Sequence, residues 1–250
     1  MNFCAIDFGH TNYKIAIIQN NSIVSVQKNS YEDISELHHL SAVVQKSSCE
    51  KIVCCNVLKE NDLQIIMNEI PNEINGMFKF LKPEDCSKYI SLAYKNNLNN
   101  LGMDRALNLV GASVKTKKDV IVIDAGTATT IDYLDSNKKH LGGIILPSKN
   151  LIDSIFLEML DFDFTNEELT NGVLSSNTRS CIENGSTISA YNVINNILDK
   201  MINDNSLSPE IYVTGGNSQD VLDNCNYPII HVESLLFEGI LVFEAWKMPP

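Results

Sequence analysis

The sequence predicts an α/β protein built from two similar domains, and two observations lead to that prediction. Strand-like and helix-like segments alternate along the chain, and one short turn sequence occurs twice. The first copy is the Asp-Phe-Gly-His-Thr of residues 7–11, and the second is the Asp-Ala-Gly-Thr of residues 124–127. In both copies an apolar, β-branched run enters a tight glycine turn and a second apolar run leaves it, which is typical of a β-hairpin. The copies lie nearly half the chain apart, so we expect the two hairpins to face each other across a cleft.

The remaining elements follow from the period of the apolar residues. We expect strands over residues 52–58, 140–147 and 211–213, and helices over residues 62–70 and 151–160. Five further apolar residues recur at helical spacing and form one stripe: Ile194, Ile197, Leu198, Met201 and Ile202. We interpret this stripe as part of the hydrophobic core. A dimer interface is the less favoured alternative.

Charge and composition limit the classes of function. The 250 residues include 31 acidic and 19 basic side chains, which gives a net charge of −12. A protein with this charge is not expected to bind nucleic acid or an anionic membrane. This balance favours small-molecule chemistry, although solubility alone would also explain it. No run reaches the roughly 18 apolar residues of a membrane helix, and no leader segment is recognisable.

The cysteines indicate a reducing, cytoplasmic setting. Seven cysteines are scattered along the chain without a Cys-x-x-Cys pair, and the five histidines are equally dispersed, so we do not expect a zinc site. A redox role for the adjacent Cys54 and Cys55 is a minor alternative.

The two glycine turns are suited to binding a polyphosphate. A turn with glycine lets backbone N–H groups approach phosphate closely, Thr11 and Thr127 add hydroxyl donors, and Lys14 adds a positive charge. Asp7 and Asp124 would repel the phosphates, by about 4 kcal/mol for two unit charges ~4 Å apart at an effective dielectric constant of ~20. The acids therefore predict bound cations, either Mg²⁺ or a monovalent ion. P-loop, dinucleotide-binding, zinc-protease and nucleophile-elbow motifs are all absent from the sequence.

A third candidate element is Gly102-Met103-Asp104-Arg105, directly before an apolar-periodic segment. We expect Asp104 and Arg105 at the start of a helix, where the helix dipole favours an ionised carboxylate by about 0.3–1 kcal/mol. Such a carboxylate can orient an attacking hydroxyl in phosphoryl transfer, and a guanidinium suits a substrate carboxylate. A helix cap and a surface ion pair are the simpler alternatives.

The order of these motifs resembles the type III pantothenate kinases. The resemblance runs from about residue 3 to about residue 243. It rests on the following series: Asp7 to Thr11 with Lys14, Gly102 to Arg105, Asp124 to Ala128, His140 to Gly143 with Pro147, Thr178-Arg179 with Gly185, and Thr214-Gly215-Gly216.

The resemblance implies a fold, an activity and an assembly. It implies two ribonuclease H-like (actin-like ATPase) domains, residues 1–115 and 116–250, that face a nucleotide cleft. The implied activity is ATP-dependent phosphorylation of pantothenate to 4′-phosphopantothenate, the first step of coenzyme A biosynthesis. Mg²⁺ and a monovalent cation, K⁺ or NH₄⁺, are implied, as is a cytoplasmic homodimer with its substrate pocket at the interface.

The resemblance also assigns residues to roles. Asp104 is the implied catalytic base, Arg105 the partner of the pantothenate carboxylate, and Asp124 the monovalent-cation ligand. ATP would be bound by Asp7, Phe8, Gly9, His10, Thr11, Asn12, Tyr13, Lys14, Thr127, Gly215 and Gly216. Pantothenate would be bound by Tyr94, Gly102, Met103, Asp104, Arg105 and Thr178.

Two residues depart from the family pattern. His10 stands where the family usually has asparagine, and Ser148 stands where it usually has glycine, which would hinder a positive φ at that position. They keep two alternatives open: a kinase for another small hydroxy acid, and an ATP-binding regulatory or scaffold protein that transfers no phosphate.

Overall fold

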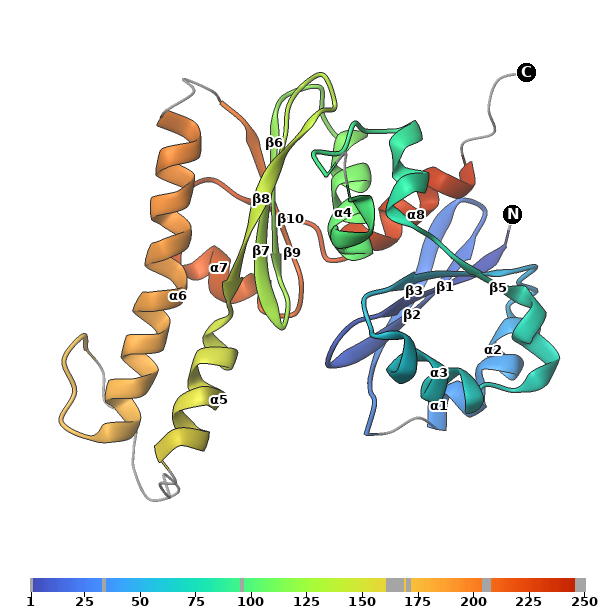
Figure 1. Cartoon of the computed structure of the whole chain (residues 1–250), viewed down its shortest axis with the longest axis horizontal. Helices are drawn as coiled ribbons and strands as arrows, with labels where there is room; N and C mark the ends of the chain where they lie inside the picture. The colour runs from blue at the N-terminus through green and yellow to red at the C-terminus, as the bar shows by residue number, and fades with distance from the viewer. Residues whose placement is uncertain are drawn as a thin grey trace. The chain divides into compact units, whose positions relative to one another are not determined.

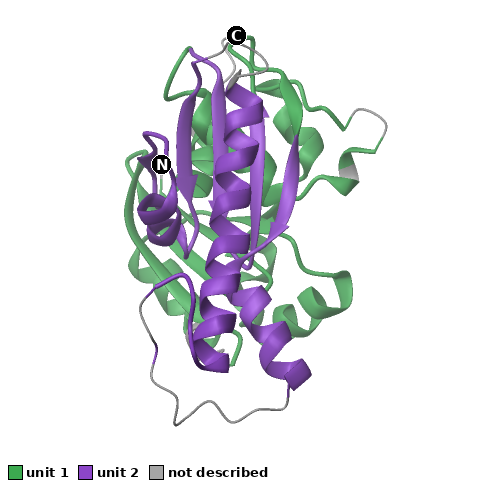
Figure 2. Ribbon diagram, turned by 90° about the vertical axis from the view of Figure 1, so that its left-hand side faces the viewer, with its two compact units in different colours: residues 1–117, 134–142, 234–250 green, residues 118–133, 143–233 purple. Residues whose placement is uncertain are grey.

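A computed structural model describes residues 2–32, 35–94, 97–160, 169, 172–203 and 208–245 of the chain. Contacts divide the chain into two compact units, coloured separately in Figure 2. The first unit comprises residues 1–117, 134–142 and 234–250, and the second comprises residues 118–133 and 143–233. The expected halves, 1–115 and 116–250, were based on the repeated turn rather than on contacts, and that division stays a prediction.

The first unit contains a five-stranded sheet with the order β3-β2-β1-β4-β5 (Figure 1). The strands are β1 (Phe3–Phe8), β2 (Asn12–Gln19), β3 (Ser22–Ser30), β4 (Ile52–Asn56) and β5 (Phe78–Phe80). β1, β2 and β3 are antiparallel neighbours, whereas β4 pairs with β1 and β5 pairs with β4 in parallel. The predicted first hairpin and the predicted strand after residue 52 are therefore both present.

One face of this sheet is covered by the helices α1 (Ser35–His38), α2 (Leu40–Lys46) and α3 (Glu60–Asn68). Alternate residues of the strands point to this face because side chains of a strand alternate in direction. Ile6 and Phe8 of β1 join Leu37 and Leu40 in one buried apolar cluster there. The neighbouring residues Ala5 and Asp7 therefore point to the opposite face.

The opposite face lies under α4 (Met103–Ser113), which contacts β4, and α4 packs closely on α8 (Leu235–Ala245). Figure 1 shows α4 and α8 side by side. A Cβ at Gly111 would lie 2.5 Å from the Leu235 carbonyl oxygen, and one at Gly239 would overlap the Leu107 carbonyl. Glycine at both positions lets the two helix backbones meet.

Shorter elements connect β4 to α4. They are the 3₁₀ turns η1 (Asn72–Met77), η2 (Pro83–Lys88) and η3 (Leu98–Asn100), together with α3 and β5. The predicted amphipathic helix over residues 62–70 is α3, which begins two residues earlier. Over the described ranges, no helix combines the length and the apolar character needed to cross a lipid bilayer.

The second sheet has the order β10-β9-β6-β7-β8. Its strands are β6 (Val120–Ala125), β7 (Ala128–Leu134), β8 (His140–Pro147), β9 (Glu210–Thr214) and β10 (Ile230–His231). β6 and β7 form the predicted second hairpin, and β9 pairs with β6 in parallel. The strands expected over residues 140–147 and 211–213 are β8 and β9.

Three helices accompany this sheet: α5 (Lys149–Leu160), α6 (Thr178–Asn203) and α7 (Ser218–Asn224). α6 buries Ile194 and Leu198 against Ile121, Ile123 and Ile131 of the sheet. These two members of the apolar stripe are core residues, and Ile197, Met201 and Ile202 are partly buried against the same cluster, which supports the favoured interpretation as core. The helix expected over residues 151–160 is α5.

Candidate active site

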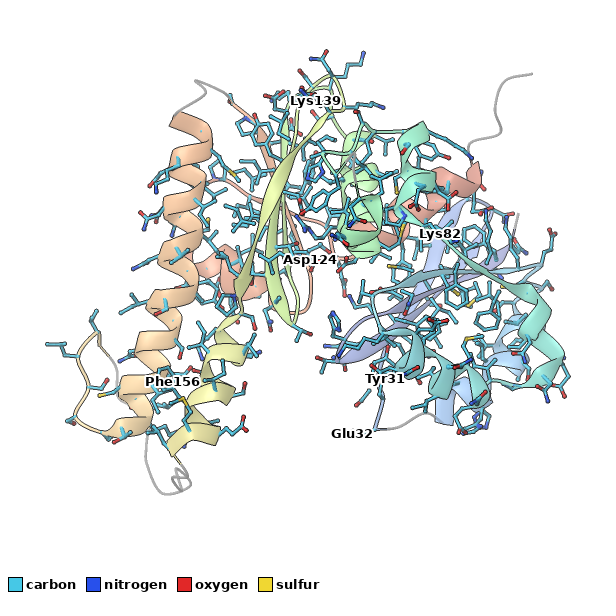
Figure 3. All side chains as sticks on the ribbon, viewed as in Figure 1. Tyr31, Glu32, Lys82, Asp124, Lys139 and Phe156 are labelled. Carbon is cyan, nitrogen blue, oxygen red and sulfur yellow. The ribbon has the colours of Figure 1, made fainter. Side chains whose placement is uncertain are left out.

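The first glycine turn connects β1 to β2 and places Asp7 at the end of the sheet face that α4 covers. Asp7 is 8% exposed, and its antiparallel partner in the sheet is Lys14. A Cβ at Gly9 would lie 2.9 Å from the Asn12 carbonyl oxygen, so the turn requires glycine. The hydroxyl of Tyr31, labelled in Figure 3, donates a hydrogen bond of 2.9 Å to the Gly9 carbonyl. The turn is thus held by the close approach of Gly9 to Asn12 and by the hydrogen bond from Tyr31. His10 and Thr11 are exposed at its tip.

The charges of Asp7 and Asp104 both act on one buried thiol, that of Cys55. Cys55 lies opposite Asp7 in the parallel β1–β4 pair and is fully buried. Burial, the charge of Asp7 and then the charge of Asp104 raise the pKa of Cys55 well above its usual range, so the thiol stays protonated. The thiol therefore donates its hydrogen bond to the Asp7 carboxylate. Two acids that are far apart in the sequence thus influence one thiol in the first unit.

The adjacent Cys54 lies on the other face of β4, in the helix-covered apolar cluster. Consecutive strand residues point to opposite faces, so the two thiols do not form a reactive pair. Burial also raises the pKa of Cys54. The minor alternative of a redox role for these two residues finds no support in this arrangement.

Asp104 lies in the first turn of α4, as the sequence predicts. Gly102 is the N-cap, Met103 is buried, and the Asp104 Oδ1 accepts a hydrogen bond of 2.8 Å from the Arg105 backbone N–H. The carboxylate folds back over Gly102, where any Cβ would overlap Asp104 Oδ1. The glycine therefore leaves the space that the carboxylate occupies.

Arg105 is buried in a small aromatic cluster. Its Nη1 lies 3.4 Å from the Tyr94 hydroxyl, and its Cζ lies 5.9 Å from the centre of the Tyr94 ring. The Tyr94 ring stacks on the ring of His140, with centroids 6.2 Å apart and planes 12° apart. A guanidinium held against an aromatic face presents its remaining donors in a defined direction. Tyr94, the expected tyrosine upstream of Gly102, is thus a direct neighbour of Arg105.

The second glycine turn belongs to the second unit, and Asp124 lies at the end of β6 (Figure 3). Gly215 has a φ of +97°, and a Cβ there would lie 2.6 Å from Asp124 Oδ1. Asn217 holds the turn with two hydrogen bonds, from its side-chain amide to the Gly126 carbonyl (3.0 Å) and from its backbone N–H to the Ala125 carbonyl (2.9 Å). The Thr-Gly-Gly segment and the Asp-x-Gly turn are therefore packed together.

Ser148 has a different effect from the one expected. Its φ is not positive, so the backbone at Ser148 is not strained. Its hydroxyl donates a hydrogen bond of 2.7 Å to the Thr127 carbonyl and accepts one of 3.2 Å from the Leu151 backbone N–H. Ser148 thus ties the start of α5 to the second turn. The serine supports this turn instead of hindering it.

Three of the remaining candidates are exposed, whereas Phe8 and Tyr13, both expected to bind ATP, are fully buried in the apolar cluster that the helices cover. The side chain of Thr127 and the backbone of Gly216 face solvent, and Thr178 is exposed at the start of α6, next to Asn177, whose side-chain oxygen accepts the Ser180 N–H. Within the ranges that the structure describes, no three histidine, cysteine or carboxylate side chains gather as a metal site.

Comparison with known proteins decides the family. A family model described as type III pantothenate kinase matches residues 3–200. The chain belongs to this family. A type III pantothenate kinase of Finegoldia magna is 25% identical over 252 residues, which cover 95% of this chain and 94% of that protein. A second, of Psychrobacter cryohalolentis, is 31% identical over 181 residues, which cover 72% and 71%.

Solved structures show the fold. A Baf family protein from Campylobacter jejuni superposes with a TM-score of 0.58 at 21% identity, over 97% of this chain and 98% of that one. Component A of (R)-2-hydroxyglutaryl-CoA dehydratase from Acidaminococcus fermentans gives 0.53 at 13%, over 96% and 95%. The chain therefore has the actin-like ATPase fold expected from its sequence, with two mixed α/β sheets.

Several residues that shape these turns were not expected from the sequence. They are Tyr31, Cys55, His140 in its stacking role, Ser148 in its hydrogen-bonding role and Asn217. Their contacts join strands and loops that are distant in the sequence, so no local spacing marks them.

Proposed function

We propose that this protein transfers the γ-phosphoryl group of ATP to pantothenate, giving 4′-phosphopantothenate, the first step of coenzyme A biosynthesis. Membership of the type III pantothenate kinase family supports the reaction class. The single observation behind the catalytic assignment is that Asp7 points to the sheet face on which α4 packs, while Asp104 lies in the first turn of α4. The phosphate turn and the helix start that the substrate would approach therefore belong to the same side of the first sheet.

Asp104 is the proposed base. The transition state of phosphoryl transfer is loose, so the acceptor hydroxyl loses its proton late and the carboxylate mainly orients it. The hydrogen bond from the Arg105 N–H to Oδ1 and the space over Gly102 hold the carboxylate at the start of α4, where it would accept a hydrogen bond from the hydroxyl. The proton would move from the hydroxyl of pantothenate to this carboxylate.

Arg105 is the proposed partner of the pantothenate carboxylate, with Tyr94 beside it. Its guanidinium is buried and held against the Tyr94 ring, and a substrate carboxylate would offer it a planar, bidentate partner. Gly102, Met103 and Thr178 complete the proposed contacts with pantothenate.

The phosphates of ATP are proposed to lie along the two turns. Backbone N–H groups of the segment from Asp7 to Lys14 and the side chains of His10, Thr11 and Lys14 would contact the nucleotide, together with Thr127, Gly215 and Gly216. Single carboxylates with substrate phosphates are the usual ligand set of Mg²⁺, and Asp7 fits that set. Mg²⁺, when bound, would neutralise charge that develops on the phosphate oxygens.

Asp124 is the proposed ligand of K⁺ or NH₄⁺. Its carboxylate lies beside two glycines, Gly126 and Gly215, where no side chain competes for the space. Hard oxygen donors of this kind suit a monovalent cation.

We further propose a homodimer in the cytoplasm, with the substrate pocket at its interface. Apolar side chains of α5 are exposed, among them Phe156, labelled in Figure 3, and Met159, which is 73% exposed. Exposed apolar surface of this kind is typical of an interface. All seven cysteines are free, which suits a reducing compartment.

The test is a coupled assay of ADP release with the purified protein and ATP, Mg²⁺ and pantothenate, in K⁺ and in tetramethylammonium. We expect turnover that requires pantothenate, falls in tetramethylammonium, and drops by about 10²–10⁴-fold in Asp104→Asn. A panel of other small hydroxy acids is the substrate control. Undiminished turnover of Asp104→Asn would reject the base assignment. Nucleotide binding without turnover on any acceptor would favour the scaffold alternative.

A further inference from the structure

A row of side chains crosses four strands of the first sheet. Lys28 of β3 lies opposite Lys14 of β2, Lys14 lies opposite Asp7 of β1, and Asp7 lies opposite Cys55 of β4. Partners in register point to the same face of a sheet. Burial decreases along the row, from the fully buried Cys55 through Asp7 and the half-buried Lys14 to the exposed Lys28. The row therefore leads from the thiol under α4 out to solvent.

The pair of lysines in this row is unusual. Like charges that lie directly opposite on neighbouring strands repel each other and destabilise a sheet. Basic side chains are in the minority in this chain, 19 against 31 acidic ones, so a chance pairing of two lysines is not favoured by composition. An anion that lies over both ammonium groups would turn the repulsion into attraction.

We propose that Lys28 is a second lysine for the phosphate chain of the nucleotide, acting together with Lys14. This inference rests on the proposed function and adds to it a residue that the motifs do not contain. Neighbouring strands are about 4.8 Å apart, so both ammonium groups can reach one polyphosphate. One lysine offsets a single charge of an anion that carries several, and the second reduces the remaining charge. A triphosphate gains more from the second lysine than a monophosphate does.

Protection of a sheet edge is the competing role for Lys28. β3 is an edge strand, and lysine on an edge strand hinders pairing with another chain. That role needs no nucleotide, so measurements of nucleotide affinity separate the two.

The experiment compares Lys28→Met, which keeps an apolar stem, with Lys28→Arg, which keeps the charge. Lys59→Met is the matched control, because Lys59 is exposed just before α3, on the helix-covered side of the same unit. For Lys28→Met we expect the KM for ATP to rise about tenfold, which corresponds to ~1.4 kcal/mol, and kcat to stay within about threefold. The KM for pantothenate should not change. Lys28→Arg and Lys59→Met should behave as the wild type.

A binding measurement without turnover keeps the two proposals separable. Calorimetry measures the Kd of the protein for the non-hydrolysable imido analogue of ATP in the presence of Mg²⁺. Pantothenate is left out, and the measurement is made at two salt concentrations. We expect a weaker Kd and a smaller salt dependence for Lys28→Met, because exposed charges are screened by salt. If the wild type binds the analogue but phosphorylates no pantothenate, the proposed function fails and the Lys28 inference is still judged by this Kd.

Two outcomes would overturn the inference. One is a Kd for the analogue that is the same in Lys28→Met as in the wild type. The other is an equal loss in Lys28→Met and Lys28→Arg, which would mean that the loss does not come from the charge. Thermal unfolding provides the folding control, and we expect the Tm of Lys28→Met to be at or above that of the wild type, because the repulsion from Lys14 is removed.

Discussion

The guanidinium of Arg105 lies against the phenol of Tyr94, with Nη1 3.4 Å from the hydroxyl and Cζ 5.9 Å from the ring centre. Tyr94 in turn stacks on His140. The charged group is buried and oriented before any substrate arrives, so its binding to a carboxylate loses little further side-chain freedom.

We predict that Arg105→Lys raises the KM for pantothenate by about tenfold or more and leaves the KM for ATP within about twofold. Lysine keeps the charge but loses the planar fork, and a charge-assisted bidentate pair is the stronger interaction. Steady-state kinetics with each substrate varied in turn provides the measurement. A rise in the KM for ATP alone would contradict the assignment of Arg105 to pantothenate.

Cys55 is predicted to act through its hydrogen bond to Asp7. Cys55→Ser keeps a donor and should retain most of the kcat, whereas Cys55→Val removes the donor and should lower kcat several-fold. Loss of one buried hydrogen bond to a charged group costs about 1.5–3 kcal/mol, so Cys55→Val should also unfold at lower urea concentration. The measurements are kcat at saturating substrates and urea unfolding. Equal kcat in the two variants would show that the thiol does not position Asp7.

Gly102→Ala is predicted to reduce kcat by about tenfold or more, because the added Cβ overlaps the Asp104 carboxylate and displaces it. Gly76→Ala is the matched control. Gly76 lies in η1, has no atom within 4 Å of an added Cβ, and should keep wild-type activity with unchanged or slightly higher stability. Wild-type kcat in Gly102→Ala would mean that the carboxylate does not need this space.

Glu244 at the end of α8 predicts a pH-dependent contribution to stability. Its side chain is 6% exposed and pairs with Lys51 and with Lys79, the latter at 3.1 Å. Burial acts to raise the pKa of Glu244, but the hydrogen bonds and charges of the two lysines outweigh it, so the pKa is lowered in the folded state. Stabilisation by a carboxyl with a lowered pKa is present above the unfolded pKa, near 4.5, and is lost as pH falls through the folded pKa.

We therefore expect Glu244→Gln to reduce the free energy of unfolding by about 1–3 kcal/mol at pH 7. The difference from the wild type should shrink as the pH falls from about 4.5 through the lower folded pKa, below which Glu244 is uncharged in the wild type as well. Urea unfolding at pH 7 and at several acidic pH values measures this. A difference that does not depend on pH would point to lost packing rather than lost charge.

The local sequence patterns were sufficient to predict the helices and strands that form the site, but not the contacts between their side chains. The two hairpins, the helix that begins at Met103 and the strand His140–Pro147 are marked by glycine turns, by a polar residue before an apolar period, or by alternation. The effect of the Asp104 charge on Cys55 depends instead on how α4 packs on the sheet, which no spacing encodes. Ser148 shows the same limit. The sequence predicts only the loss of a glycine, whereas the two hydrogen bonds of the serine hydroxyl depend on groups that the folded loop brings within reach.

The close packing of Gly111 against Gly239 also sets an order of events during synthesis. A ribosome must translate past residue 245 before α8 exists, although α4 and the whole first sheet have left the exit tunnel long before. Until then the side of α4 that packs on α8 has no cover, and domains generally fold as complete units. The first unit can therefore complete its folding only after α8 has been synthesised. Chains truncated before residue 235 would expose that surface to chaperones and proteases.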